Sequence, residues 1–138
     1  MKTAQLQRQL EMEEIGAAFH PHMAMARAIL ILDENTSFLK ESLEKLNFRV
    51  YIVKNDLKNE QTAPLLAHRI FVTNNPKNFL SAAAIYEFSM IDTSNAYQDP
   101  TSLAQEISEA WIAMKLKGKQ PFVLHLNRGG APSLESVD

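Results

Sequence analysis

Short apolar runs alternate with polar, helix-forming stretches along the central part of this chain. Ala28–Leu32, Arg49–Val53 and Ile70–Thr73 are rich in aliphatic, aromatic and β-branched side chains, which favours buried strands. Two further runs, Phe88–Ile91 and Phe122–Leu126, predict two more strands. Because strands that alternate with helices are joined by right-handed crossovers, the pattern predicts a mostly parallel sheet.

The stretches between these runs carry helix signals. Leu103, Ile107, Trp111 and Met114 repeat at helical spacing after Asp99 and Pro100, which suit the cap and first turn of a helix. Shorter helices are expected at 37–46, around 61–67 and at 79–85. The fold class that follows is α/β, a three-layer sandwich with a mostly parallel central sheet of about four to five strands and an extra N-terminal helix.

The pattern divides the chain into three parts. Residues 1–27 form a helical arm and linker, in which Pro21 stops a helix rich in Gln, Glu, Leu and Ala. Residues 28–127 form the α/β domain. Residues 128–138 contain Gly129-Gly130, Pro132 and serines, and are expected to be a flexible tail. We predict a single domain with appendages at both ends.

Composition excludes several classes of function. The 138 residues include no cysteine, which excludes disulfides, thiolate nucleophiles and zinc sites built on sulfur. The formal net charge is −2, so no basic excess indicates a nucleic-acid partner. No apolar run reaches the ~18 residues that span a bilayer, and the polar start of the chain is unlike a signal peptide. We therefore expect a cytoplasmic protein without a membrane partner.

The most informative chemistry follows the first and third strands. Asp33 and Glu34 come directly after the first strand, and the third is followed by an amide-rich loop that contains Asn74, Asn75 and Asn78. Ligands and metals bind at the carboxyl ends of parallel strands in open α/β sheets. Consecutive residues of a strand point to opposite faces, so only one of the two acids can aim into a common site. In contrast, His125 and Trp111 sit in apolar surroundings and are expected to be structural.

With its elements in this order, the chain resembles the PIN-like ribonuclease superfamily, and most closely its short, toxin-type branch. The resemblance covers roughly residues 28–126. The segments that carry it are Leu32–Asn35, Leu46–Phe48, Val50–Val53, Arg69–Phe79, Ser89–Ile91 and Pro100–Met114.

The resemblance implies a site for one or two Mg²⁺ or Mn²⁺ ions held by several carboxylates, because hard divalent ions prefer oxygen ligands. Asp33 matches the first family carboxylate. Glu60 is the best candidate for the second metal ligand, with Asp56 next. Asn78 stands directly before Phe79, where the family has an aspartate. An asparagine brings no negative charge, so we expect a degenerate catalytic site made of Asp33, Glu60 and Asn78. Asp92 is a weaker candidate for a fourth acid.

Three functions remain open at this point. The first is a toxin-type, metal-dependent ribonuclease with weak activity, in which Lys54, Lys58, Arg69 and Lys77 contact the phosphates of RNA. The second is a non-catalytic module on the same scaffold that binds an antitoxin-like protein or a second copy of itself. The third is a degenerate receiver-like signalling domain, although no acid follows Thr73, where such a domain carries its phospho-accepting aspartate.

Overall fold

A computed structural model describes residues 26–54, 59–118 and 121–137, with the backbone alone at residues 59 and 60. The expected N-terminal helix lies outside the described residues. In chain order, the described elements are β1 (Ile29–Leu32), η1 (Ser37–Leu39), α3 (Lys40–Lys45), β2 (Arg49–Ile52), α4 (Asn59–Leu66), β3 (Ile70–Thr73), η2 (Pro76–Phe79), α5 (Leu80–Tyr86), β4 (Ser89–Asp92), α6 (Pro100–Lys117), β5 (Phe122–Asn127) and β6 (Gly130–Ser136), with η1 and η2 being 3-10 helices.

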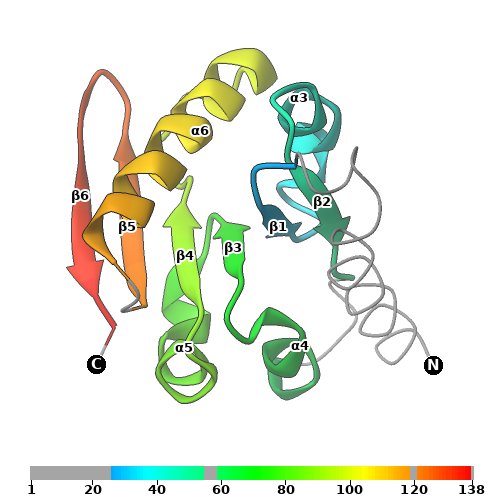
Figure 1. The fold of residues 1–138 in the computed structure, drawn as a ribbon, viewed down its shortest axis with the longest axis vertical. Helices are drawn as coiled ribbons and strands as arrows, with labels where there is room; N and C mark the ends of the chain where they lie inside the picture. The colour runs from blue at the N-terminus through cyan, green and yellow to red at the C-terminus, as the bar shows by residue number, and fades with distance from the viewer. Residues whose placement is uncertain (1–25, 55–58, 119–120, 138) are drawn as a thin grey trace.

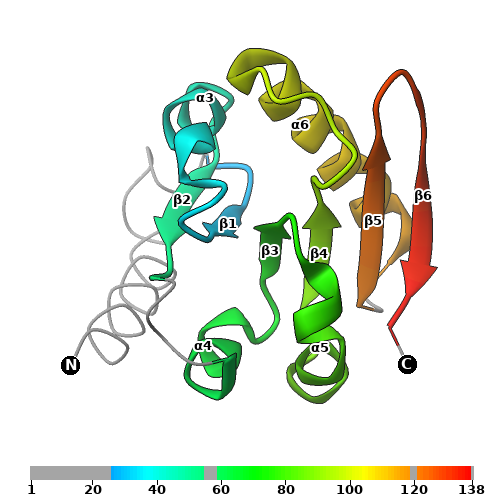
Figure 2. The same ribbon diagram turned by 180° about the vertical axis from the view of Figure 1, so that it is seen from behind.

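The strands form one six-stranded sheet in the order β2-β1-β3-β4-β5-β6 (Figures 1 and 2). The first five of these strands are parallel to their neighbours, and β6 runs antiparallel to β5. The α/β class and the mostly parallel sheet are therefore confirmed. The strand order reverses between β1 and β3, since β2 lies on one side of β1 and all later strands lie on the other. Such a reversal is the switch point at which doubly wound sheets bind ligands.

The segment expected to be a flexible tail contributes the sixth strand. Gly130–Ser136 pairs with β5, and Leu134 lies opposite Leu124 while Ser133 lies opposite His125. A short Asn127–Gly130 connection with Gly129 at φ 69° closes the hairpin. Most side chains of β6 are exposed, and the segment accordingly has few apolar residues. Its sequence pattern therefore differs from that of the buried strands. β5 is consequently an interior strand of the sheet.

Helices cover both faces of the sheet. Figure 1 shows α3 beside α6, and α4 and α5 together at the opposite end of the view. Leu30, Leu32 and Val72 belong to the hydrophobic core that includes residues of α3 and α6. Ile31 and Phe71 belong to the core that includes residues of α4 and α5. Alternate residues of each strand thus enter different cores, which explains why the strands are almost continuously apolar.

Helix α6 begins where the sequence predicts. Asp99 accepts a hydrogen bond from the Ser102 backbone N–H at 2.9 Å, Pro100 occupies the first turn, and Gly118 follows the last residue. The backbone and side-chain hydrogen bonds from Ser102 lower the pKa of Asp99. The start of η1 differs from the start of α6: the preceding residue, Thr36, makes no side-chain cap hydrogen bond to the helix. None of the helices among the described residues is long and apolar enough to cross a lipid bilayer.

After three of the helices, a residue other than glycine adopts the left-handed backbone conformation, with a positive φ angle. Asn47 (φ 72°), His68 (φ 60°) and Glu87 (φ 56°) lie between α3 and β2, α4 and β3, and α5 and β4, respectively. Each turns the chain back at the amino-terminal edge of the parallel strands. Asparagine tolerates this conformation better than most residues, whereas histidine and glutamate adopt it at some cost in free energy.

Candidate functional site at the carboxyl edge of the sheet

Asp33 lies at the carboxyl end of β1, at the switch point, and its side chain is only 9% exposed. Its Oδ1 accepts hydrogen bonds from the Thr36 backbone N–H at 2.9 Å and from the Thr36 hydroxyl at 3.1 Å. Its Oδ2 accepts a hydrogen bond from the Thr73 hydroxyl at 3.0 Å. The neighbouring Glu34 lies in the turn after β1 and is exposed. Both oxygens of the buried carboxylate therefore have a protein donor.

Thr73 connects Asp33 to the loop after β3. Its hydroxyl donates to Asp33 and accepts a hydrogen bond from the Asn75 backbone N–H at 3.1 Å. Thr36 is also close to this strand, with 3.1 Å between its hydroxyl oxygen and the Val72 carbonyl oxygen. Two hydroxyls and a loop amide thus fix the carboxylate between the adjacent strands β1 and β3. Buried polar networks of this kind hold one geometry when their members are satisfied.

A second acidic group lies farther along the same edge. Asp92 ends β4 in register with Thr73 on β3 and with His125 on β5. Its Oδ1 accepts a hydrogen bond from the Ser94 backbone N–H at 2.9 Å, and its Oδ2 is 2.7 Å from Nδ1 of His125. The other ring nitrogen of His125 is 3.3 Å from Oε1 of Glu135 on β6. Residues in register on parallel strands share a face, so Thr73, Asp92 and His125 form a row on the α4/α5 face.

His125 is the titratable centre of this row. Burial by itself would lower its pKa, but hydrogen bonds to Asp92 and Glu135, together with the charges of both carboxylates, outweigh burial and raise the pKa above 6.5. In the protonated form, both ring nitrogens carry a proton, and each donates to one carboxylate. The imidazole is partly exposed, so it can exchange its proton with solvent.

The structure brings some of the predicted site residues to the carboxyl edge. Lys54 follows β2 there, and Lys77 and Asn78 lie in η2 after β3; all three side chains are exposed. The backbone N–H of Asn78 lies 3.4 Å from the Asn75 carbonyl oxygen. Glu60 belongs to α4, but its side chain lies outside the described part, as do Asp56 and Lys58 in full. The expected set of Asp33, Glu60 and Asn78 is therefore untested.

Arg69 does not lie at the carboxyl edge beside Lys54 and Lys77. It directly precedes β3 and lies at the amino-terminal edge of the sheet. One of its guanidinium nitrogens donates to the Leu65 carbonyl at 3.1 Å, so the side chain interacts with the end of α4. The direction of the strand explains the difference, because a residue before a parallel strand and a residue after it lie at opposite edges.

Of the two predicted metal ligands, Asp33 and Glu60, only Asp33 has a side chain among the described residues. Magnesium ions are commonly held by one or two carboxylates, with waters and phosphates completing an octahedral shell. Asp33 supplies one buried carboxylate, and its oxygens already accept protein hydrogen bonds. Among the described residues, no group of three or more His, Cys, Asp or Glu side chains could hold a metal ion.

Sequence reasoning missed the cluster of Asp92, His125 and Glu135. Asp92 and His125 are 33 positions apart, and their contact depends on the register of β4 against β5. Glu135 joins them only because β6 exists. The sequence offers only a weak signal: Asp92 follows one predicted strand and His125 lies in another, and no local pattern shows that these two strands pair.

Comparison of the chain with protein-family models, curated proteins and solved structures finds no match.

Proposed function

We propose that this chain is a PIN-like, toxin-type domain whose carboxylate site is degenerate, so that its Mg²⁺- or Mn²⁺-dependent ribonuclease activity is weak or lost. The observation that carries the proposal is the link made by Thr73, whose hydroxyl joins Asp33 to the loop that leads to Asn78. Two of the three positions that the resemblance assigns to the catalytic site, Asp33 and Asn78, thus belong to one edge of the sheet. One of them has a carboxylate, and the other has an amide.

The residues at this edge suggest how RNA would bind. Asp33 would hold a divalent ion, which activates water and stabilises charge on a phosphate when it is bound. Lys54 and Lys77 are exposed beside this edge and can pair with phosphates. Asn78 can offer only a neutral carbonyl oxygen, which lowers the affinity for a dication. If the ion binds too weakly, the remaining role is that of an interaction module, with an antitoxin-like protein or a second copy as partner.

A receiver-like signalling domain is the second candidate, and the strand order favours it. The order 2-1-3-4-5 of the parallel strands is also that of flavodoxin-like sheets, which include receiver domains. Thr73 occupies the end of β3, where a phospho-accepting aspartate would be needed, and its hydroxyl is engaged by Asp33 and Asn75. Signalling through phosphorylation of β3 is therefore the less favoured reading.

The test is a calorimetric titration of Mn²⁺ into the wild-type protein, Asp33→Asn and Asn78→Asp, followed by cleavage assays on single-stranded RNA. We expect weak binding in the wild type, less in Asp33→Asn, and at least about tenfold tighter binding in Asn78→Asp because a carboxylate replaces an amide. Asn75→Asp is the matched control, since it adds the same charge to the same loop.

The outcomes separate the alternatives. Tighter binding in Asn78→Asp but not in Asn75→Asp, with RNA cleavage that depends on Mn²⁺, supports the degenerate nuclease. Equal effects of both variants would mean that charge alone attracts the ion, and the PIN-like assignment of Asn78 would fail. Transfer of phosphate from acetyl phosphate to the wild-type protein would favour the receiver-like candidate instead.

A further inference from the structure

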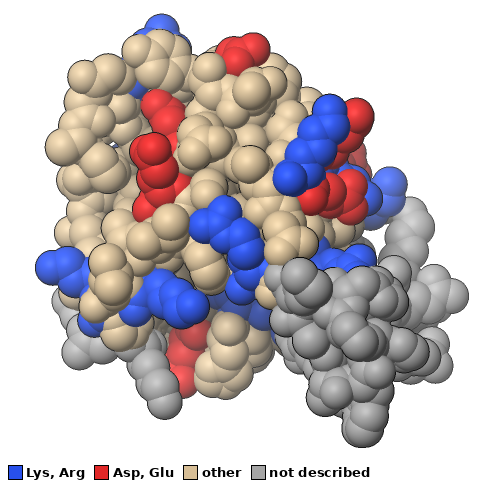
Figure 3. All heavy atoms as spheres, turned by 45° about the horizontal axis from the view of Figure 1, so that its top comes forward, with Lys and Arg blue, Asp and Glu red and all other residues tan. Residues whose placement is uncertain are grey.

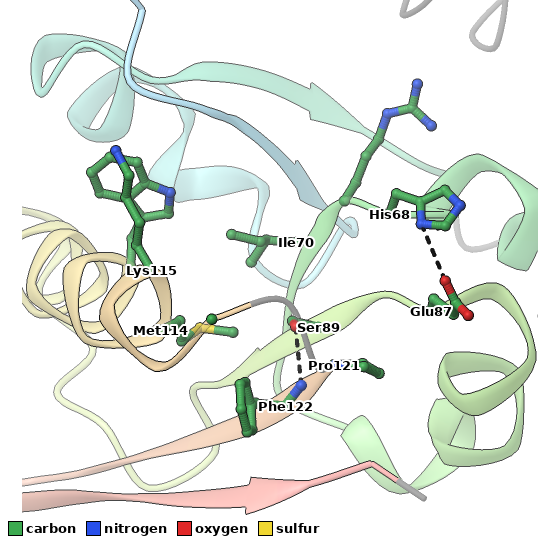
Figure 4. Close-up of a pocket in the computed structure, with 11 residues that line it drawn as sticks. His68, Ile70, Glu87, Ser89, Met114, Lys115, Pro121 and Phe122 are labelled. Atoms are coloured by element: carbon green, nitrogen blue, oxygen red, sulfur yellow. Dashed lines mark hydrogen bonds and ion pairs between the residues drawn. The ribbon is translucent and has the colours of Figure 1, made fainter.

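A cavity lies at the other edge of the sheet. It has a volume of about 390 Å³ and opens where β3, β4 and β5 begin and α6 ends. In Figure 4, Lys115 and Met114 lie on one side of this cavity, His68 and Glu87 on the other, and Ile70 and Ser89 between them. The volume falls within the range of pockets for small molecules, about 300–1,000 Å³.

The walls of this amino-edge pocket are apolar and aromatic. Trp111 and Met114 come from α6, Ile70 comes from β3, and Phe122 comes from β5. Trp111 is partly exposed and packs edge-on against Phe48 at 5.6 Å between ring centroids. The Arg27 guanidinium lies 4.7 Å from the centroid of the indole ring, so the indole is held in place in the wall of the pocket. A planar, apolar body is the kind of group that such walls accommodate.

The polar groups around the pocket are mainly donors. The Lys115 ammonium lies 5.0 Å from the centroid of the Trp111 ring, on an exposed side chain. The Ser89 hydroxyl accepts a hydrogen bond from the Phe122 backbone N–H at 3.0 Å, which leaves its own proton for a ligand. Glu87, the acidic residue of the lining, faces His68 at 3.7 Å. In Figure 3, Lys and Arg side chains gather in a band across the lower half of the view.

We propose that the amino-edge pocket binds a small anion that carries a planar ring, with the ring against the apolar walls and the anionic group at Lys115. An aromatic carboxylate and a nucleoside monophosphate share this chemistry. The ring would be accepted by the apolar walls, and the anionic group would receive a charge-assisted hydrogen bond from Lys115. The proposal is independent of the Asp33 site, which lies at the opposite edge.

The chain provides its own reporter, because Trp111 is its single tryptophan. We would titrate adenosine 5′-monophosphate and phenylacetate and follow tryptophan fluorescence, with adenosine and phenylacetamide as neutral counterparts and inorganic phosphate as the anion alone. We expect saturable quenching by at least one ring-bearing anion, with affinity at least about tenfold above that of its neutral counterpart. The anion that binds identifies phosphate or carboxylate as the preferred group.

Lys115→Gln should weaken this binding about tenfold, because the ammonium is lost while most of the side-chain length is kept. Lys117→Gln is the matched control: Lys117 is exposed on the same turn of α6 but does not line the pocket. Binding would be confirmed by calorimetry, since Lys115 also affects the indole directly. Quenching by neither anion, equal binding of the neutral counterparts, or unchanged affinity in Lys115→Gln would each overturn the proposal.

Discussion

The two edges of the parallel sheet differ in how their polar groups are used. At the carboxyl edge, the carboxylates of Asp33 and Asp92 accept hydrogen bonds from neighbouring strands and loops. At the amino edge, Lys115 and Ser89 border a cavity with apolar walls. Doubly wound sheets usually bind ligands at the carboxyl edge. Among the described residues, the carboxyl edge contributes more to holding the fold together, and the amino edge has a cavity of about 390 Å³ for a ligand.

The largest effect should come from removing the carboxylate at the switch point. Asp33→Ala deletes the acceptor of three hydrogen bonds and removes the carboxylate to which the buried Thr73 hydroxyl donates. We expect the free energy of unfolding to fall by about 2–4 kcal/mol, measured by urea denaturation. Asn35→Ala, at an exposed position two residues later, should change it by less than about 0.5 kcal/mol. Equal losses in both variants would contradict the structural role of Asp33.

The same comparison shows what could be predicted from the sequence. The strands and the start of α6 follow from local patterns, because continuous apolar runs and the Asp99-Pro100 pair act over a few residues. The place of Asp33 at a carboxyl end follows from the same local reading. The contact between Asp92 and His125 does not, because it needs the pairing of β4 with β5. The position of Arg69 could have been predicted, since it precedes its strand.

A smaller effect is expected from the titration of His125. The pKa of His125 is raised in the folded protein, so the protonated imidazole stabilises the folded state. This stabilisation is fully present below the unfolded pKa of about 6.5 and is lost as the pH rises through the folded pKa. The free energy of unfolding should therefore decrease as the pH rises from about 6.5 through the raised folded pKa of His125. The decrease should be less than about 1 kcal/mol, because the imidazole is partly exposed to solvent.

The measurement is a series of urea denaturations across this pH range, with His125→Gln beside the wild type. The variant should lose the part of the pH dependence that belongs to His125. His68→Gln is the matched control, because His68 is an exposed histidine whose carboxylate partner is 3.7 Å away. If the pH dependence persists in His125→Gln and disappears in His68→Gln, it arises from His68 at the amino edge. That result would contradict the prediction that His125 causes it.

The smallest effect on stability is expected at the amino edge. Lys115→Gln removes an exposed ammonium from the face of Trp111 and should change the free energy of unfolding by no more than about 0.5 kcal/mol. Thermal denaturation without ligand would measure it. A loss as large as that of Asp33→Ala would mean that Lys115 is required for folding, and the two edges would then not differ as described.

The left-handed residues between helices and strands indicate how this scaffold could be engineered. His68 and Glu87 hold positive φ angles that glycine adopts at little cost. Replacing either residue by glycine should raise the free energy of unfolding by on the order of 1 kcal/mol. Both side chains line the amino-edge pocket. A thermostabilised variant would therefore also show whether ligand binding in the pocket requires these two side chains.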